Sequence, residues 1–130
     1  MSRRIIAVVP DLFFSTRILA TARTVGVPVD LIPLPRALAA CTEALPALVL
    51  IDLHANGDPM GLVRALKADA RTREIPVVGF YSHVETALRR AALEAGIDEA
   101  LPRSAFTQRL PELLSGAPIA EPVEDVLEEE

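Results

Sequence analysis

Polar side chains that could bind a phosphate or a metal ion lie at or just after the ends of four apolar runs of this 130-residue chain. In chain order they are Asp11, Asp52, the pair Tyr81 and Ser82, and Arg103. Two carboxylates that lie close together repel each other, and Mg²⁺ relieves that repulsion by taking oxygen ligands. A carboxylate held by a metal, beside a hydroxyl and a cation, can accept a phosphoryl group. This chemistry requires a fold that gathers all four positions at one edge.

The apolar runs are short, and amphipathic segments alternate with them. The runs occupy residues 5–9, 27–34, 48–53, 75–80 and 99–101. They contain so little polar alternation that they are typical of strands covered on both faces, as in a parallel sheet.

The segments between the runs carry helical periodicity and recognisable ends. Gly26 is expected to end the first helix, Pro35 lies near the start of the second, and Asp58 precedes a proline at the start of the third. The first helix is expected to begin with Ser15 or Thr16 as its N-cap.

Two further helices follow the fourth and fifth runs. Ser82 and Glu85 have the spacing of a capping box, which predicts the start of a fourth helix that ends at Gly96. The fifth helix is predicted over residues 107–114. Pro111 is expected near its start, because a proline deeper in a helix costs about 3 kcal/mol.

A strand followed by a helix therefore occurs five times. Right-handed crossovers predict an α/β fold with a doubly wound, five-stranded parallel sheet of order 2-1-3-4-5, the flavodoxin-like arrangement. Ligands bind such sheets outside the carboxyl ends of the strands, which is where the four polar positions fall.

Composition limits the class of protein. Hydrophobic residues make up 51% of the chain, and its length fits one domain, expected over residues 1–117. The net charge is −5, but six of the 18 acids lie in residues 121–130, so the first 120 residues carry 13 basic and 12 acidic groups. Residues 118–130 are expected to be a disordered acidic tail. Neither a nucleic-acid partner nor a membrane span is expected, and the unpaired Cys41 points to a reducing, cytoplasmic location.

Other chemistries have little support in the sequence. No glycine-rich phosphate loop follows the first apolar run, which disfavours a nucleotide or flavin site. His54 and His83 lack the spacing of zinc ligands, and Cys41 has no evident base beside it. The chain is not expected to be an enzyme. A sensor of an anion or another small ligand in the same crevice stays open as a third interpretation.

Residues 4–115 resemble the receiver domain of bacterial two-component response regulators. Five blocks carry the resemblance: residues 48–53 (LVLIDL), Asn56-Gly57, residues 62–67 (LVRALK), residues 75–78 (IPVV) and residues 91–101 (AALEAGIDEAL). The resemblance implies that Asp52 is the phosphoacceptor. It also implies that Mg²⁺ would be held by Asp52, Asp11 and the backbone carbonyl of His54.

The sequence departs from the receiver pattern around this site. Pro10 replaces one of the two acids after the first strand, and Tyr81 stands where receivers have Thr or Ser, unless a one-residue shift places Ser82 there. Arg103 replaces a lysine, and Ala100 replaces the aromatic residue of the last strand. Arginine keeps the charge of lysine but has a wider, planar head. Magnesium binding is therefore expected to be weak.

We therefore expect a stand-alone, receiver-like signalling module that acts by protein–protein contact with little or no phosphorylation. The alternative is an atypical receiver that is phosphorylated on Asp52 in a Mg²⁺-dependent reaction, by a histidine kinase or a small phosphodonor, with Tyr81, Ser82 and Arg103 as phosphate contacts. The partners would be signalling proteins, a kinase or an output protein, and the chain would be a monomer or a weak homodimer. The expected partner face contains Arg89, Arg90, Leu101 and Phe106.

Overall fold

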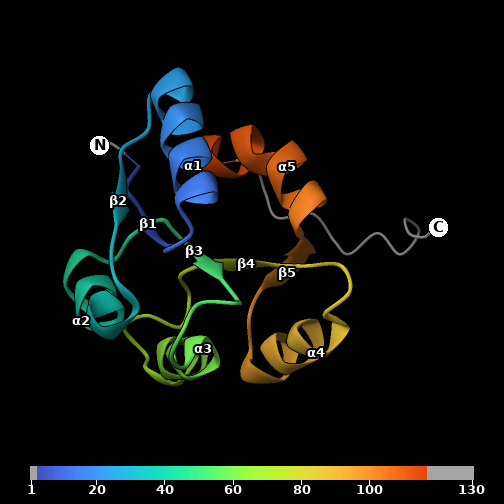
Figure 1. Ribbon diagram of the computed structural model, residues 1–130. Coiled ribbons are helices and arrows are strands. Elements are labelled where there is room, and N and C mark those ends of the chain that lie inside the picture. Colours follow the sequence, from blue (N-terminus) through green and yellow to red (C-terminus); the bar gives the residue numbers. More distant parts are fainter. Residues whose placement is uncertain (1–2, 117–130) are drawn as a thin grey trace.

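The computed structural model describes residues 3–116, which fold into five strands and five helices in strict alternation (Figure 1). The strands are β1 (Ile5–Val8), β2 (Val29–Leu31), β3 (Leu48–Asp52), β4 (Val77–Tyr81) and β5 (Glu99–Pro102). The helices are α1 (Leu12–Val25), α2 (Leu34–Ala44), α3 (Pro59–Ala68), α4 (Thr86–Ala95) and α5 (Arg103–Ser115).

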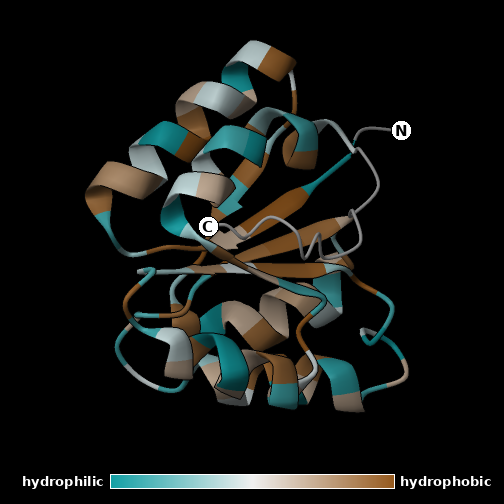
Figure 2. Ribbon diagram, turned by 90° about the vertical axis from the view of Figure 1, so that its right-hand side faces the viewer, coloured by the Kyte–Doolittle hydropathy of each residue, from teal (hydrophilic) through white to brown (hydrophobic). Residues whose placement is uncertain are grey.

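The strands form one parallel sheet in the order β2-β1-β3-β4-β5, as the sequence predicts. The register pairs Ile5 with Leu48, and Asp52 with Phe80. Two layers of helices cover the sheet: α1 and α5 lie on one face, and α2, α3 and α4 lie on the other (Figures 1 and 2). The predicted α/β class and strand order are confirmed.

The central strands are apolar because both of their faces are covered. Every residue of β1, β3 and β4 is buried. Alternate side chains point to opposite faces, so Ile6 and Val49 join the core beneath α2, α3 and α4, whereas Ile5 and Leu50 join the core beneath α1 and α5. The edge strand β2 is only three residues long, shorter than the predicted run.

The first helix begins earlier than predicted. Its N-cap is Asp11, whose Oδ1 accepts a hydrogen bond of 2.9 Å from the backbone N–H of Phe14. The prediction of Ser15 or Thr16 as N-cap was wrong. Ser15 is instead buried inside the first turn, where its hydroxyl donates to the carbonyl of Leu12.

The start of α4 also differs from the prediction. The predicted capping box is absent, because the N-cap position is Glu85 and its side chain makes no capping hydrogen bond. The backbone N–H of Glu85 instead donates to the carbonyl of Ser82 at 2.7 Å, which closes a turn before the helix. Ser82 therefore belongs to the β4–α4 loop.

The last helix is longer than predicted and encloses a proline. It begins at Arg103, directly after β5, and Pro111 is its ninth residue. The expectation that Pro111 lies at the helix start was wrong. Buried side chains on both sides of Pro111 hold the helix against the sheet, namely Phe106, Leu110, Leu113 and Leu114. This packing outweighs the local cost of the proline.

Residues 117–130, with the expected acidic tail, lie outside the described residues. Among residues 3–116, no helix has both the length and the apolar character needed to span a membrane.

Candidate functional site

Asp52 is the last residue of β3, and the residue as a whole is 3% exposed. Its Oδ1 accepts a hydrogen bond of 2.8 Å from the backbone N–H of His54. Burial raises the pKa of Asp52, and the hydrogen bond from His54 opposes that rise. The structure thus holds a desolvated carboxyl at the place where the sequence predicts the phosphoacceptor.

Asp11 lies at the start of α1, on the loop after β1, and its side chain is exposed. Its negative charge is close enough to contribute to the raised pKa of Asp52. The adjacent strands β1 and β3 bring the two acids to the same edge of the sheet. One oxygen of Asp11 is already engaged, because it caps the helix.

His54 has a side-chain role that sequence reasoning missed. Its Nε2 accepts a hydrogen bond of 2.9 Å from the backbone N–H of Ser82. The imidazole therefore links the loop after β3 to the loop after β4, beside Asp52. The sequence offers no signal for this contact, since 28 residues separate the two partners.

Tyr81 is largely buried at the end of β4. The residue is 5% exposed and packs in the core beneath α2, α3 and α4. Burial raises the pKa of the Tyr81 phenol, and the positive charge of Arg89 opposes that rise. Ser82, half-buried, follows at the end of the strand and presents its backbone N–H to His54.

The guanidinium of Arg103 lies over an aromatic ring at the first turn of α5. Its Cζ is 5.4 Å from the ring centroid of Phe14. The positive charge of Arg103 lowers the pKa of Asp52, which means that it favours the ionised carboxylate. Its Nε is buried and has no hydrogen-bond partner among the described residues.

An aromatic stack supports this cation. The ring centroid of Phe14 is 4.9 Å from that of Phe80, and Phe80 lies 4.6 Å from Phe106. The stack joins α1, β4 and α5 on one face of the sheet. It fixes the position of Phe14 and therefore of the surface on which Arg103 rests.

The donor set for a metal ion is small. Within residues 3–116, no group of three or more His, Cys, Asp or Glu side chains is arranged to hold a metal. The candidate ligands are the carboxylates of Asp52 and Asp11 and the backbone carbonyl of His54. Mg²⁺ is commonly bound by one or two carboxylates and completes its shell with water, so this set fits Mg²⁺ only in a largely hydrated form.

One residue of the expected partner face is misplaced. Phe106 is fully buried in the aromatic stack, so its assignment to a partner surface was wrong. Its position on α5 follows the helical period that turns it toward the sheet. Arg89 and Arg90 are exposed on α4, and Leu101 on β5 is half-buried.

Comparison with known proteins places the fold in a defined class. No family model matches the chain, and no curated protein matches it. Among solved structures, it is similar to the receiver domain of a sensor histidine kinase from Pseudomonas aeruginosa, with 20% identity, a TM-score of 0.73, and coverage of 89% of this chain and 100% of the other. That structure has a magnesium ion coordinated in its active-site cleft.

Two further solved structures, both of response regulators, are similar to the chain over most of its length. A putative response regulator from Chloroflexus aurantiacus is 19% identical, with a TM-score of 0.78 and coverage of 87% and 94%. The chemotaxis response regulator CheY4 of Vibrio cholerae is 16% identical, with a TM-score of 0.75 and coverage of 88% and 97%. The chain therefore has the receiver fold, and the resemblance seen in the sequence is confirmed at the level of the fold.

Proposed function

We propose that this protein is a receiver-like signalling module that acts through protein–protein contacts, with little or no phosphorylation on Asp52. The observation that carries this proposal is the hydrogen bond from the Ser82 N–H to His54 Nε2. A phosphoryl group on Asp52 would need hydrogen-bond donors around its oxygens. The imidazole already occupies the backbone donor at the end of the neighbouring strand β4.

Two other residues support the same function. The Tyr81 side chain is packed in the core beneath α2, α3 and α4. The Cζ of Arg103 lies over the ring of Phe14, a cation–π contact worth about 0.5–2 kcal/mol that holds the guanidinium in its place. Tyr81 and Arg103, at two of the expected phosphate-contact positions, are thus held by packing contacts with neighbouring side chains.

The proposed partners are signalling proteins, either a kinase or an output protein, in the cytoplasm. The proposed contact surface is the exposed side of α4 with the adjoining part of β5, and it contains Arg89, Arg90 and Leu101. Phe106 has no part in it, because its side chain is buried. In this role the protein transmits a signal by binding and is not an enzyme.

The alternative is Mg²⁺-dependent phosphorylation of Asp52 by a histidine kinase or a small phosphodonor. It is favoured by the charges of Asp11 and Arg103, which both act on the Asp52 carboxyl. Asp52, Asp11 and the carbonyl of His54 would hold the ion, which would offset the negative charge of the incoming phosphate. Arg103, whose Nε has no hydrogen-bond partner among the described residues, would be the cation that contacts that phosphate.

A single experiment separates these functions. The purified protein is incubated with Mg²⁺ and either acetyl phosphate or beryllofluoride, and the mass and the amide chemical shifts around Asp52 are followed. We expect no adduct on the unmodified chain. An adduct that forms on it and disappears in Asp52→Asn would overturn the proposal in favour of phosphorylation.

A second variant tests the observation that carries the proposal. His54→Ala removes the imidazole, releases the Ser82 N–H and keeps the backbone carbonyl at position 54. We expect this variant to form the beryllofluoride adduct more readily than the unmodified chain. Equal and negligible adduct formation in both proteins would show that the imidazole is not what blocks the site.

A further inference from the structure

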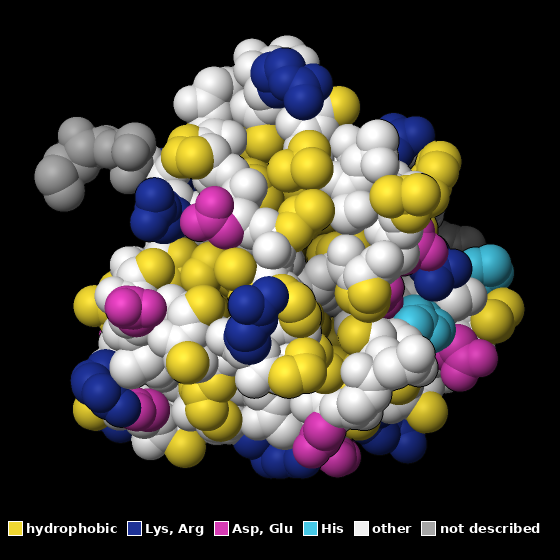
Figure 3. Space-filling view, turned by 60° about the vertical axis from the view of Figure 1, so that its left-hand side comes forward, with side chains coloured by type: hydrophobic (Ala, Val, Ile, Leu, Met, Phe, Trp, Pro, Cys, Tyr) yellow, Lys and Arg dark blue, Asp and Glu magenta, His cyan; other side chains and the backbone are white. Residues whose placement is uncertain are grey.

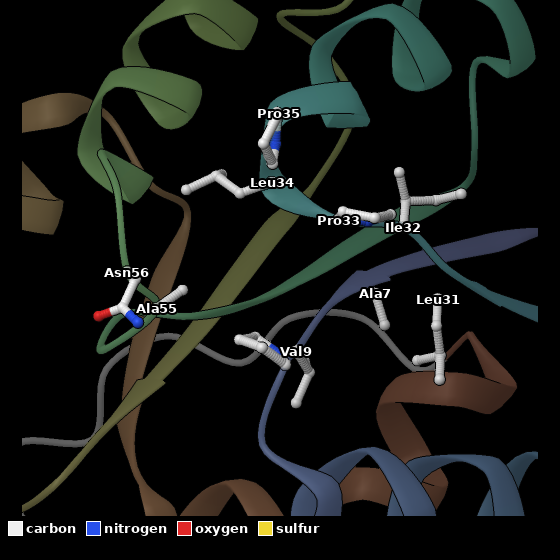
Figure 4. A pocket seen from close by; sticks show the side chains of 10 residues that line it. Ala7, Val9, Leu31, Ile32, Pro33, Leu34, Pro35, Ala55 and Asn56 are labelled. Carbon is white, nitrogen blue, oxygen red and sulfur yellow. The ribbon is translucent and has the colours of Figure 1, made fainter.

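A cavity of about 390 Å³ opens at the carboxyl end of the sheet, next to the acidic site. Its walls come from the end of β1, the segment between β2 and α2, and the loop after β3 (Figure 4). The lining residues are Ala7, Val9, Pro10, Leu31, Ile32, Pro33, Leu34, Pro35, Ala55 and Asn56.

The cavity lies where parallel sheets of this kind bind ligands. From β1 the chain crosses to β2 on one side, and from β3 it crosses to β4 on the other, so the strand order reverses between β1 and β3. The loops after these two strands diverge and leave a crevice outside their carboxyl ends. Its volume is within the range of about 300–1,000 Å³ that is usual for small-molecule sites.

The lining determines the chemistry of the ligand. Nine of the ten residues are apolar, and Asn56 on the β3–α3 loop has the one polar side chain among them. None of the lining residues that the structure describes carries a charge, and the three prolines among them have no backbone N–H to offer to an anion. A phosphate or a nucleotide would be poorly matched here, whereas an uncharged apolar molecule would exchange water for apolar contacts.

Prolines and contacts between neighbouring segments shape the walls of the cavity. Pro33 precedes the first turn of α2 with φ −64°, and Pro35 lies within that turn. The Ile32 N–H donates to the carbonyl of Ala7 at 3.0 Å, which ties the β2–α2 segment to β1. Leu34 packs against Gly57, since a Cβ on that glycine would lie 3.0 Å from Leu34 Cδ2. A preformed site loses little entropy when it binds.

The mouth of the cavity continues into exposed apolar surface. Leu31, which lines it, is 40% exposed on the edge strand. The view that brings the β2 and α2 side of the molecule forward shows hydrophobic side chains across the middle of this face (Figure 3). A ligand that entered the cavity would cover part of this surface.

We propose that this cavity is a binding site for a small, uncharged, mainly apolar molecule. The site includes Ala55 and Asn56 of the β3–α3 loop, which contains His54 and directly follows Asp52, so a bound molecule contacts the segment next to the candidate phosphoacceptor. Binding here needs neither a metal nor a phosphate. The binding proposal can therefore be tested whether or not Asp52 is phosphorylated.

The test uses indole as the probe, because it is uncharged, apolar and soluble. Indole is titrated into the full ¹⁵N-labelled chain, and amide chemical shifts are followed. We expect saturable shifts at Ile32, Leu34, Ala55 and Asn56. Indole-3-acetate should bind at least about tenfold more weakly, because its carboxylate would be desolvated with no cation beside it. Shifts that do not saturate, or that cluster elsewhere, would overturn the proposal.

Two leucine variants provide a matched comparison. Leu31→Glu puts a carboxylate at the mouth of the cavity and should weaken indole binding at least about fivefold. Leu45→Glu makes the same change at an exposed leucine of the α2 C-terminus, outside the cavity lining, and should leave the affinity unchanged. Equal affinities in both variants would rule out the cavity as the site. Both positions are exposed, so both variants are expected to fold.

A second pair of variants replaces an alanine with leucine, once inside the cavity and once outside it. Ala55→Leu occupies part of the space and should abolish saturable binding, whereas Ala87→Leu on the exposed side of α4 should not. Undiminished binding of indole to the folded Ala55→Leu variant would contradict the proposal.

Discussion

At the scale of single residues, burial and hydrogen bonding act in opposite directions on the Asp52 carboxyl. Burial favours the protonated form and is the larger effect, while the N–H of His54 and the charge of Arg103 favour the ionised form. The balance leaves the pKa above its usual value of 3.8. An ionised Asp52 is therefore a source of instability in the free protein.

This imbalance makes the stability of the protein depend on pH. Because the pKa of Asp52 is raised by folding, its favourable contribution is complete below pH 3.8 and is lost as the pH rises through the folded-state pKa. Asp52→Asn should raise the free energy of unfolding at pH 7 by about 1 kcal/mol or more, and the gain should shrink toward pH 4. Urea denaturation at the two pH values measures both effects, and an equal gain at both would contradict the argument.

Asp11 has a different role in stability, because its side chain is exposed and caps α1. Asp11→Ala should lower the free energy of unfolding by about 1 kcal/mol, since the Phe14 N–H loses its acceptor. Asp11→Asn, which can still cap, should change it by only a few tenths of a kcal/mol. Thermal unfolding followed by circular dichroism compares the two, and similar losses in both would mean that charge rather than capping matters.

At the scale of elements, α5 contains a residue that disfavours helix, Pro111, and is held in place by buried side chains. Pro111 lacks the N–H that would bond to the preceding turn. The helix nevertheless continues to Ser115, because Leu110, Leu113 and Leu114 are buried against the sheet. Tertiary contacts therefore decide the length of this helix.

Replacing this proline should stabilise the protein. Pro111 is exposed, so Pro111→Ala adds a backbone donor without removing a core contact, and the free energy of unfolding should rise by about 1–3 kcal/mol. Glu112→Ala, at the neighbouring exposed position, should change it by less than about 0.5 kcal/mol. Chemical denaturation of both variants checks the comparison, and a loss of stability in Pro111→Ala would show that the helix is adapted to the proline.

At the scale of the whole molecule, the aromatic stack joins the helices of one face to the sheet. Phe14, Phe80 and Phe106 come from α1, β4 and α5. The ring centroid of Phe80 lies 4.9 Å from that of Phe14 and 4.6 Å from that of Phe106. Phe13, the neighbour of Phe14, is 63% exposed and only touches the stack at its edge. Phe14 is therefore part of the packed stack, whereas its neighbour Phe13 contributes little to the packing of this face.

A pair of substitutions compares a fully buried ring of the stack with the exposed Phe13. Phe106→Ala should lower the free energy of unfolding by about 3–5 kcal/mol, because it leaves a cavity in the core. Phe13→Ala should cost less than about 0.5 kcal/mol. Guanidinium denaturation gives both values. A small loss for Phe106→Ala would mean that the core beneath α1 and α5 can collapse around the missing ring.

Much of the fold could be predicted because hydrophobic burial is encoded locally. The run from Leu48 to Asp52 has no polar alternation, which is possible only for a strand covered on both faces. Gly26 and Gly96 end their helices in the left-handed conformation, as expected. Helix starts were less predictable, since Asp11 and Ser15 are both residue types that cap helices, and the structure shows that Asp11 accepts the capping hydrogen bond.

Some features of the candidate site were likewise predictable from the sequence, and others were not. The sequence alone determined the strand order and the edge of the sheet at which Asp11, Asp52, Ser82 and Arg103 would gather, because short apolar runs and right-handed crossovers leave few other topologies. The tertiary structure decided which of their polar atoms are already engaged. It placed the His54 imidazole on the Ser82 amide, turned Phe106 into the core and left an apolar cavity beside the acids. Contacts between loops that are distant in the chain depend on side-chain orientation and close packing, and neither has a periodic signature in a sequence.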